Sequence, residues 1–221
     1  MRACVIAAIL FGLLPIPASA DDAALAETKR QTFVVQSCPG TGKAIIGSGV
    51  VVARDRGILT IATAAHAIVP GDTLRILDVS RRAYYDVVGI KVLSEYDLAL
   101  VRVRAQVHFS VAPVPIAKAA PDEPVWLWGH PPDTFWVVAK GSVIDAQAQI
   151  PGRSGSPRIT IACESCAHGD SGAGVFDALG RLLGILTHKW SNAEGTIAFY
   201  ELAPATIITQ ELKAPVSYFA P

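Results

Sequence analysis

Short runs of apolar and β-branched residues follow one another along most of the chain, and this pattern limits the folds open to it. Each run ends at glycine, proline or polar residues, which is typical of strands joined by turns. Helical segments do not alternate with the runs, so the pattern predicts an all-β sandwich or barrel and not a parallel sheet with crossover helices. The predicted strands are residues 33–35, 44–46, 50–53, 58–63, 73–79, 84–93, 97–104, 125–128, 134–140, 142–150, 158–163, 174–176, 181–187 and 196–202.

A proline-rich connection divides these strands into two halves. Residues 110–124 contain four prolines, which lack the backbone N–H that a sheet needs. We expect a mobile or helical lead-in before the first half and a short helix after the second. The predicted boundaries are 21–32 for the lead-in, 33–112 for the first half, 122–202 for the second and 203–212 for the helix.

The N-terminus has the layout of a secretory signal peptide. Arg2 precedes an apolar run over residues 5–14, and the small residues Ala18-Ser19-Ala20 form a cleavage site. The alternative, an uncleaved anchor, is disfavoured because the run is shorter than the ~20 residues that span a bilayer. We therefore expect a mature chain that starts at Asp21 and is secreted or periplasmic. Its formal net charge of 0 before cleavage does not favour binding to nucleic acid or to an anionic membrane.

Three cysteines remain after the predicted signal peptide removes Cys4. In an oxidising compartment an odd number allows one intrachain bridge and one free thiol. Cys163 and Cys166 are near enough in sequence to close a small loop, but Cys38 can pair with either. A metal site built from Cys163, Cys166 and His168 lacks a second ligand pair at zinc-like spacing, so neither a metal nor another cofactor is expected.

The segment His168-Gly169-Asp170-Ser171-Gly172-Ala173-Gly174 places a serine between small residues. Its glycines allow backbone conformations that other residues resist and leave space for a substrate carbonyl. The N–H groups of Gly169 and Ser171 can point at one spot and stabilise the oxyanion of an acyl intermediate. By itself the motif also fits an ordinary surface turn.

A serine nucleophile needs a base and a carboxylate that orients the base. His66 follows Thr63-Ala64-Ala65 at the end of one predicted strand, and Asp97 begins Asp97-Leu98-Ala99-Leu100 in another. Taken singly, His66 also fits a surface histidine and Asp97 a residue that caps a strand. Their occurrence with Ser171 in the order His, Asp, Ser favours the catalytic interpretation.

With these motifs, residues 33–212 resemble the trypsin-like (chymotrypsin-fold) serine peptidases. Gly47-Ser48-Gly49-Val50 and Trp128-Gly129-His130-Pro131 are most similar to compact bacterial secreted or periplasmic members of the HtrA type. The chain ends about fifty residues after Ser171, so no PDZ domain is expected. The resemblance implies two six-stranded antiparallel β-barrels, with His66 and Asp97 from the first and Ser171 from the second.

The resemblance further implies an exported serine endopeptidase that cleaves polypeptides through an acyl-enzyme on Ser171. His66 would act as general base and then acid, Asp97 would orient it, and the N–H groups of Gly169 and Ser171 would form the oxyanion hole. Two other functions remain open, an inactive homologue that binds protein and an esterase that uses the same residues. The oligomeric state is also left open.

The family pattern also implies substrate-binding residues, but the specificity stays open. Thr187 is expected to help hold the catalytic carboxylate, and residues 187–189 to pair with an extended substrate. The pocket floor is one residue longer than usual. Glu164 there would favour Lys or Arg at P1, the residue before the scissile bond, whereas Ser165 would leave the pocket neutral. His188 and Lys189 would favour acidic side chains, and His168 is expected to bind substrate too, unless such residues only form the rim.

Several positions depart from the family pattern. Ala67 follows the histidine where the family often has a cysteine, so the usual partner of Cys38 is missing. Asp170 is kept, but the chain has no Ile-Val-Gly-Gly-like start to supply the N-terminal amine that pairs with this aspartate in trypsin-like enzymes. We therefore expect that removal of the signal peptide is enough for activity.

Overall fold

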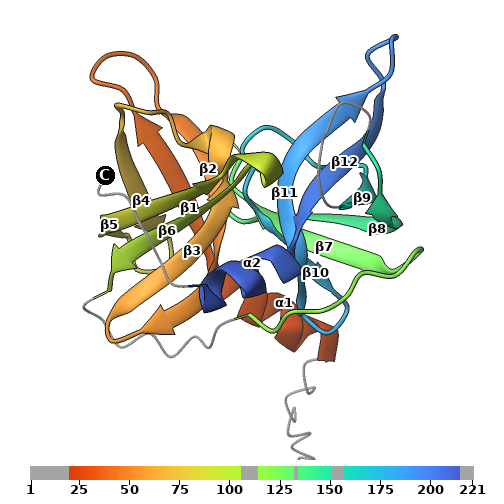
Figure 1. Ribbon diagram of the computed structural model, residues 1–221, viewed down its shortest axis with the longest axis horizontal. Helices are drawn as coiled ribbons and strands as arrows, with labels where there is room; N and C mark the ends of the chain where they lie inside the picture. Colours follow the sequence, from red (N-terminus) through yellow and green to blue (C-terminus); the bar gives the residue numbers. More distant parts are fainter. Residues whose placement is uncertain (1–19, 106–113, 132–133, 151–156, 215–221) are drawn as a thin grey trace, which may run out of the picture.

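Two closed barrels of six antiparallel strands each stand side by side in the computed structural model (Figure 1). The structure describes residues 20–105, 114–131, 134–150 and 157–214. The predicted signal peptide lies outside these residues, apart from its last position, and so does Cys4. None of the described helices is long and apolar enough to cross a membrane.

The first barrel has the strand order β1-β2-β3-β6-β5-β4. Two short 3-10 helices, η1 and η2, lie at the ends of β3 and β5. The elements are β1 Thr32–Cys38, β2 Ile45–Asp55, β3 Ile58–Ala64, η1 Ala65–Ala67, β4 Thr73–Asp78, β5 Ala83–Leu93, η2 Ser94–Tyr96 and β6 Leu98–Arg104.

The second barrel has the strand order β10-β11-β12-β9-β8-β7. Helix α1 precedes the first barrel, and helix α2 follows the second. The elements are α1 Ala20–Arg30, β7 Pro124–Gly129, β8 Val137–Ala148, β9 Arg158–Cys163, β10 Gly174–Asp177, β11 Leu182–Ser191, β12 Ile197–Pro204 and α2 Ala205–Lys213.

Three apolar cores hold this arrangement together, one inside each barrel and one between them. Alternation along a strand serves two cores at once, because successive side chains point to opposite faces. In β3, for example, Leu59 and Ile61 fill the first barrel, whereas Ala62 faces the core between the barrels. That core also takes Ile207 and Ile208 from α2.

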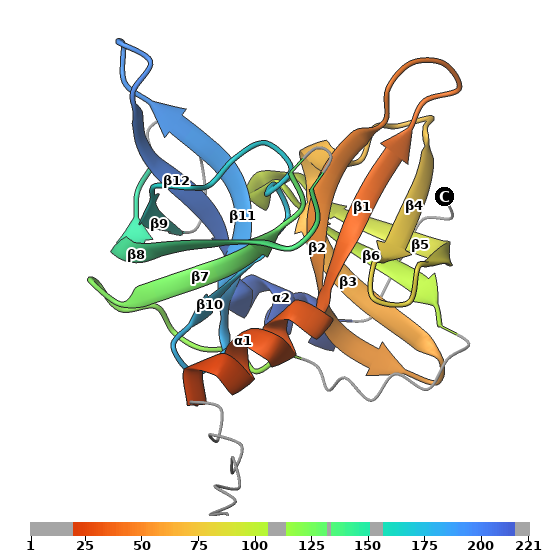
Figure 2. The same ribbon diagram turned by 180° about the vertical axis from the view of Figure 1, so that it is seen from behind.

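Helix α1 runs across the base of the two barrels and leads into β1 (Figure 2). The indole N–H of Trp128 in β7 donates to the carbonyl oxygen of Leu25 at 3.1 Å, and that of Trp126 donates to the hydroxyl of Thr28 at 3.3 Å. The lead-in is therefore helical and bound to the second barrel.

The predicted all-β fold with two six-stranded barrels and a short C-terminal helix is confirmed. Two details of the strand prediction were wrong, because residues 45–46 and 50–53 belong to the single strand β2, and residues 137–140 and 142–148 belong to the single strand β8. The glycines between them mark close packing and not turns. A Cβ on Gly49 would lie 2.7 Å from Ile61 Cγ2, and one on Gly141 would lie 2.0 Å from the Ala162 carbonyl oxygen.

Candidate active site

His66 lies on η1 directly after β3, and Asp97 lies between η2 and the start of β6, the strand that pairs with β3 in the first barrel. The backbone N–H of His66 donates to Asp97 Oδ1 at 2.9 Å, and its ring Nδ1 donates to Asp97 Oδ2 at 2.6 Å. The N–H of Ala65 donates to the carbonyl oxygen of Asp97 at 2.8 Å, which fixes the two turns against each other. Because Asp97 occupies Nδ1, the imidazole can accept a proton at Nε2.

The carboxylate of Asp97 also sets the acidity of His66. Its hydrogen bond raises the pKa of His66 above the ordinary 6.5, partial burial opposes this shift, and the negative charge of Asp97 adds to it. The imidazolium that forms when His66 accepts a proton is therefore stabilised.

Ser171 stands on a loop between β9 and β10 that the first barrel holds in place. Gly169 and Gly172 have φ angles of 96° and 87°, which a side chain would strain. A Cβ on Gly172 would lie 2.1 Å from the Ser48 carbonyl oxygen. Ser48 in β2 in turn holds the loop with two hydrogen bonds of 2.8 Å. Its N–H donates to the carbonyl oxygen of Ser171, and its hydroxyl donates to the carbonyl oxygen of Gly169.

Two backbone N–H groups of this loop remain available to bind a substrate oxygen. The N–H of Asp170 donates to the Ala167 carbonyl oxygen and that of Gly172 to the Leu186 carbonyl oxygen. The N–H groups of Gly169 and Ser171, by contrast, donate to no other residue in the described part of the chain.

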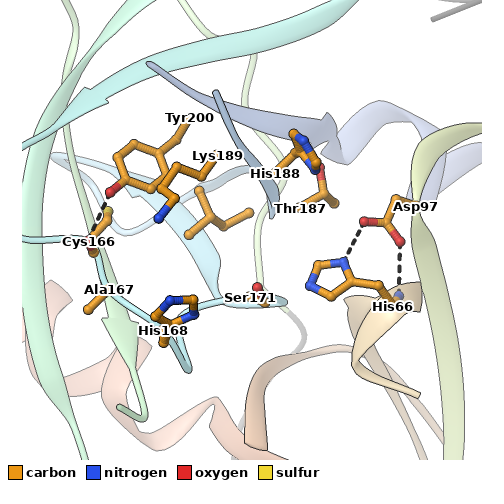
Figure 3. Close-up of a pocket in the computed structure, with 11 residues that line it drawn as sticks. His66, Asp97, Cys166, Ala167, His168, Ser171, Thr187, His188, Lys189 and Tyr200 are labelled. Atoms are coloured by element: carbon orange, nitrogen blue, oxygen red, sulfur yellow. Dashed lines mark hydrogen bonds and ion pairs between the residues drawn. The ribbon is translucent and has the colours of Figure 1, made fainter. Parts of the chain in front are cut away.

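Ser171, His66 and Asp97 line one cavity of about 770 Å³, with the imidazole between the carboxylate and the serine (Figure 3). Over the described ranges, no hydrogen bond joins the Ser171 hydroxyl to His66. Such bonds are often long before a substrate binds, so this arrangement is compatible with proton transfer from the serine.

Comparison with known proteins identifies the family. A model of the trypsin-like peptidase domain matches residues 47–185, which is more than half of the chain and includes His66, Asp97 and Ser171. The chain belongs to this family. No curated protein matches its sequence significantly.

Solved structures agree on the fold of this trypsin-like domain. The serine endoprotease from Yersinia pestis superposes with a TM-score of 0.69 at 20% identity, covering 90% of this chain and 66% of its own. The active form of the Rv3671c protease from M. tuberculosis gives a TM-score of 0.68 at 17% identity, covering 98% of this chain and 96% of its own. This chain thus spans just under two thirds of the Yersinia chain.

The cavity of the trypsin-like domain brings together most, but not all, of the predicted substrate-binding residues. His168, Thr187, His188 and Lys189 line it. The hydroxyl of Thr187 donates to the Glu201 carbonyl oxygen at 3.3 Å, so the expected bond to Asp97 is not formed. Leu186 and Tyr200, which the sequence did not single out, complete the wall together with Cys166 and Ala167.

Glu164 and Ser165 do not form the predicted pocket floor. Both are exposed and lie outside the cavity lining. The reason is the disulfide Cys163–Cys166, which closes a loop over a separation of three residues and turns the residues inside it outward. This local pairing also settles the cysteine alternatives and leaves Cys38 free.

Asp170, next to the serine, is a buried carboxylate with one satisfied oxygen. Its Oδ2 accepts the N–H of Ala167 at 2.7 Å, whereas its buried Oδ1 has no hydrogen-bond partner among the described residues. Burial raises the pKa of Asp170 to about 6, although the bond from Ala167 acts in the opposite direction. The cationic partner of this aspartate in trypsin-like enzymes is thus absent from its described contacts.

Proposed function

We propose that this trypsin-like protein is an exported serine endopeptidase that cleaves polypeptides through an acyl-enzyme on Ser171. The observation that carries the proposal is the pair of bonds from His66 to Asp97, which leaves the imidazole nitrogen Nε2 free in the cavity that contains Ser171. Membership of the trypsin-like peptidase family supports the reaction class.

In the proposed mechanism, His66 Nε2 takes the proton of the Ser171 hydroxyl as Oγ attacks the scissile carbonyl carbon. The N–H groups of Gly169 and Ser171 stabilise the oxyanion. When the C–N bond breaks, His66 gives the proton to the leaving amine. Water, deprotonated by His66, then attacks the ester and releases the carboxylic acid and the free serine. Asp97 stabilises the imidazolium in each half of the cycle.

An exposed edge of β11 supports binding of an extended polypeptide. Strand β10 pairs with β11 only as far as Ile185, and the loop amide of Gly172 takes the Leu186 carbonyl oxygen. From Thr187 onward the backbone of β11 beside the cavity can therefore pair with a substrate strand.

Export is supported by the predicted signal peptide and by the Cys163–Cys166 disulfide, because such bonds persist in oxidising compartments. We accordingly propose that the protein is secreted or periplasmic. The mature chain starting at Asp21 is proposed to be active without a further cut.

Labelling with a fluorophosphonate tests the proposal, since the probe reacts only with an activated serine. The protein that starts at Asp21 should be labelled, Ser171→Ala should not, and peptide substrates should be hydrolysed as well as esters. A folded protein that is never labelled would instead support an inactive, protein-binding homologue. If the protein is labelled and hydrolyses esters but not peptides, it is an esterase.

A further inference from the structure

The side chain of Lys189 faces the cavity that contains Ser171. Strands β11 and β12 pair so that Lys189 lies opposite Tyr200, and opposed residues of an antiparallel pair project from the same face. Tyr200 is 4% exposed, lines the cavity and donates its hydroxyl to the Cys166 carbonyl oxygen at 2.9 Å. The ammonium group of Lys189 therefore points into the space between Tyr200 and the serine loop (Figure 3).

One lysine and three histidines line this cavity, against a single carboxylate. Asp97 is the carboxylate among the lining residues, and it is bonded to His66 at 2.6 Å. Lys189 forms no ion pair with any residue in the described segments, so its charge is not compensated there. The imidazoles of His168 and His188 also line the cavity and add no negative charge.

A second cavity, of about 660 Å³, is also lined by more basic than acidic residues. It shares His66, His168 and Ser171 with the first and extends to Lys43, without a carboxylate in its lining. Because the formal net charge of the whole chain is 0, this excess of cations is a local property of the proposed cleft.

The acidic residues near the cavity do not cancel the charge of Lys189. Glu164 is exposed and lies outside the lining. Asp170 acts on Tyr200 electrostatically and contributes, after burial, to the raised pKa of that phenol. However, Asp170 does not line the cavity, and its Oδ2 is bonded to the N–H of Ala167.

We propose that Lys189 selects polypeptides with Glu or Asp at P1, the residue before the scissile bond. A P1 carboxylate in this cavity would accept a charge-assisted hydrogen bond from Nζ, which is stronger in a partly enclosed site than on an open surface. A P1 Lys or Arg would meet a like charge. The volume of about 770 Å³ admits any side chain, so charge and not size discriminates. This inference rests on the proposed function.

Peptide substrates that differ only in Glu or Gln at P1 provide the test, because the two side chains have nearly the same shape. For the wild type, kcat/KM should be about tenfold higher for Glu, the ratio expected for one charge-assisted bond in a half-open site. The ratio should fall as salt is added. In Lys189→Gln the ratio of kcat/KM for the Glu and Gln substrates should fall to about one, while the Gln substrate is still cleaved. Lys189→Glu should prefer substrates with Lys at P1.

A matched control separates local contact from overall charge. Lys140→Gln makes the same change at an exposed position of β8 outside the cavity lining, so it should keep the wild-type ratio. Fluorophosphonate labelling of each variant reports on the proposed function separately. Labelled protein with a Glu:Gln ratio near one, or with equal ratios in wild type and Lys189→Gln, would overturn the specificity and leave the serine peptidase in place. Absence of labelling in folded wild type would overturn both.

Discussion

Replacement of Asp170 by asparagine should stabilise the protein at neutral pH, although the residue precedes the proposed nucleophile. Asp170 is 2% exposed, and its Oδ1 has no hydrogen-bond partner among the described residues. Burial raises its pKa from 3.8 to about 6, so the folded state binds the proton more tightly than the unfolded state. The folded protein therefore loses stability as pH rises from about 3.8 to about 6, and the loss is complete above that range.

The size of this loss follows from the shift. A difference of about two pKa units, at 1.36 kcal/mol per unit, amounts to about 3 kcal/mol. Asparagine has nearly the same shape, can accept the Ala167 N–H through its carbonyl oxygen and carries no charge. The free energy of unfolding of Asp170→Asn, relative to that of the wild type, should thus be about 3 kcal/mol higher at pH 7.5 than at pH 3.5. A constant contribution from the amide group does not affect this difference between the two pH values.

Urea unfolding of both proteins, with the disulfide intact, measures this difference across the pH range. Asp177→Asn is the matched control. Asp177 is 1% exposed, but its carboxylate accepts the N–H groups of Leu179 and Arg181 and the Arg181 guanidinium at 2.7 Å. Its replacement should therefore cost about 1.5–3 kcal/mol at pH 7.5. An advantage of Asp170→Asn that does not grow as pH rises would refute the reasoning, and one that shrinks would indicate that a cation pairs with Asp170.

Three other substitutions test the site and the contact between the barrels. In Asp97→Asn, kcat should fall about 10⁴-fold because the imidazole loses its orienting acceptor. Its residual activity should also reach half-maximum at lower pH than in the wild type, whose His66 has a pKa above 6.5, as a pH profile of kcat/KM would show. Gly172→Ala should abolish fluorophosphonate labelling, since its Cβ would lie 2.1 Å from a main-chain oxygen of β2 at a φ of 87°. Arg158→Met should cost about 3–5 kcal/mol in urea unfolding, because it leaves the buried Glu201 without its cation, and Glu201→Gln added to it should restore part of that loss.

The strands could be predicted because alternation and turn residues are local signals, whereas the two six-stranded barrels were implied by the family resemblance. The errors occurred at glycines, whose role depends on what approaches them from elsewhere in the chain. Gly49 lies inside β2 because Ile61 of β3 leaves no space for a side chain, and Gly141 lies inside β8 because the backbone of β9 comes equally close. A single sequence does not reveal either neighbour, so the predicted strands were divided at both glycines.

The three proposed catalytic residues could be found because each lies in a short motif with distinctive neighbours. The cavity wall could not be predicted in the same way, since it depends on strand register and on one covalent choice. Tyr200 reaches the wall because β12 pairs it with Lys189. Glu164 leaves the wall because Cys166 bonds to Cys163, a pairing that the sequence left open.

The contact between the barrels is the part of the site that sequence patterns describe least. Arg158, at the start of β9, forms a buried ion pair with Glu201 at 3.0 Å. Its guanidinium also donates to the Glu95 carbonyl oxygen and lies 4.4 Å from the ring centre of Tyr96 in η2, directly before Asp97. Asp97 and the serine belong to different barrels, so their separation depends on contacts of this kind. A charged residue at the start of a strand would ordinarily be assigned to the surface, and only its burial at 1% exposure reveals that it links the second barrel to the turn that carries the proposed catalytic carboxylate.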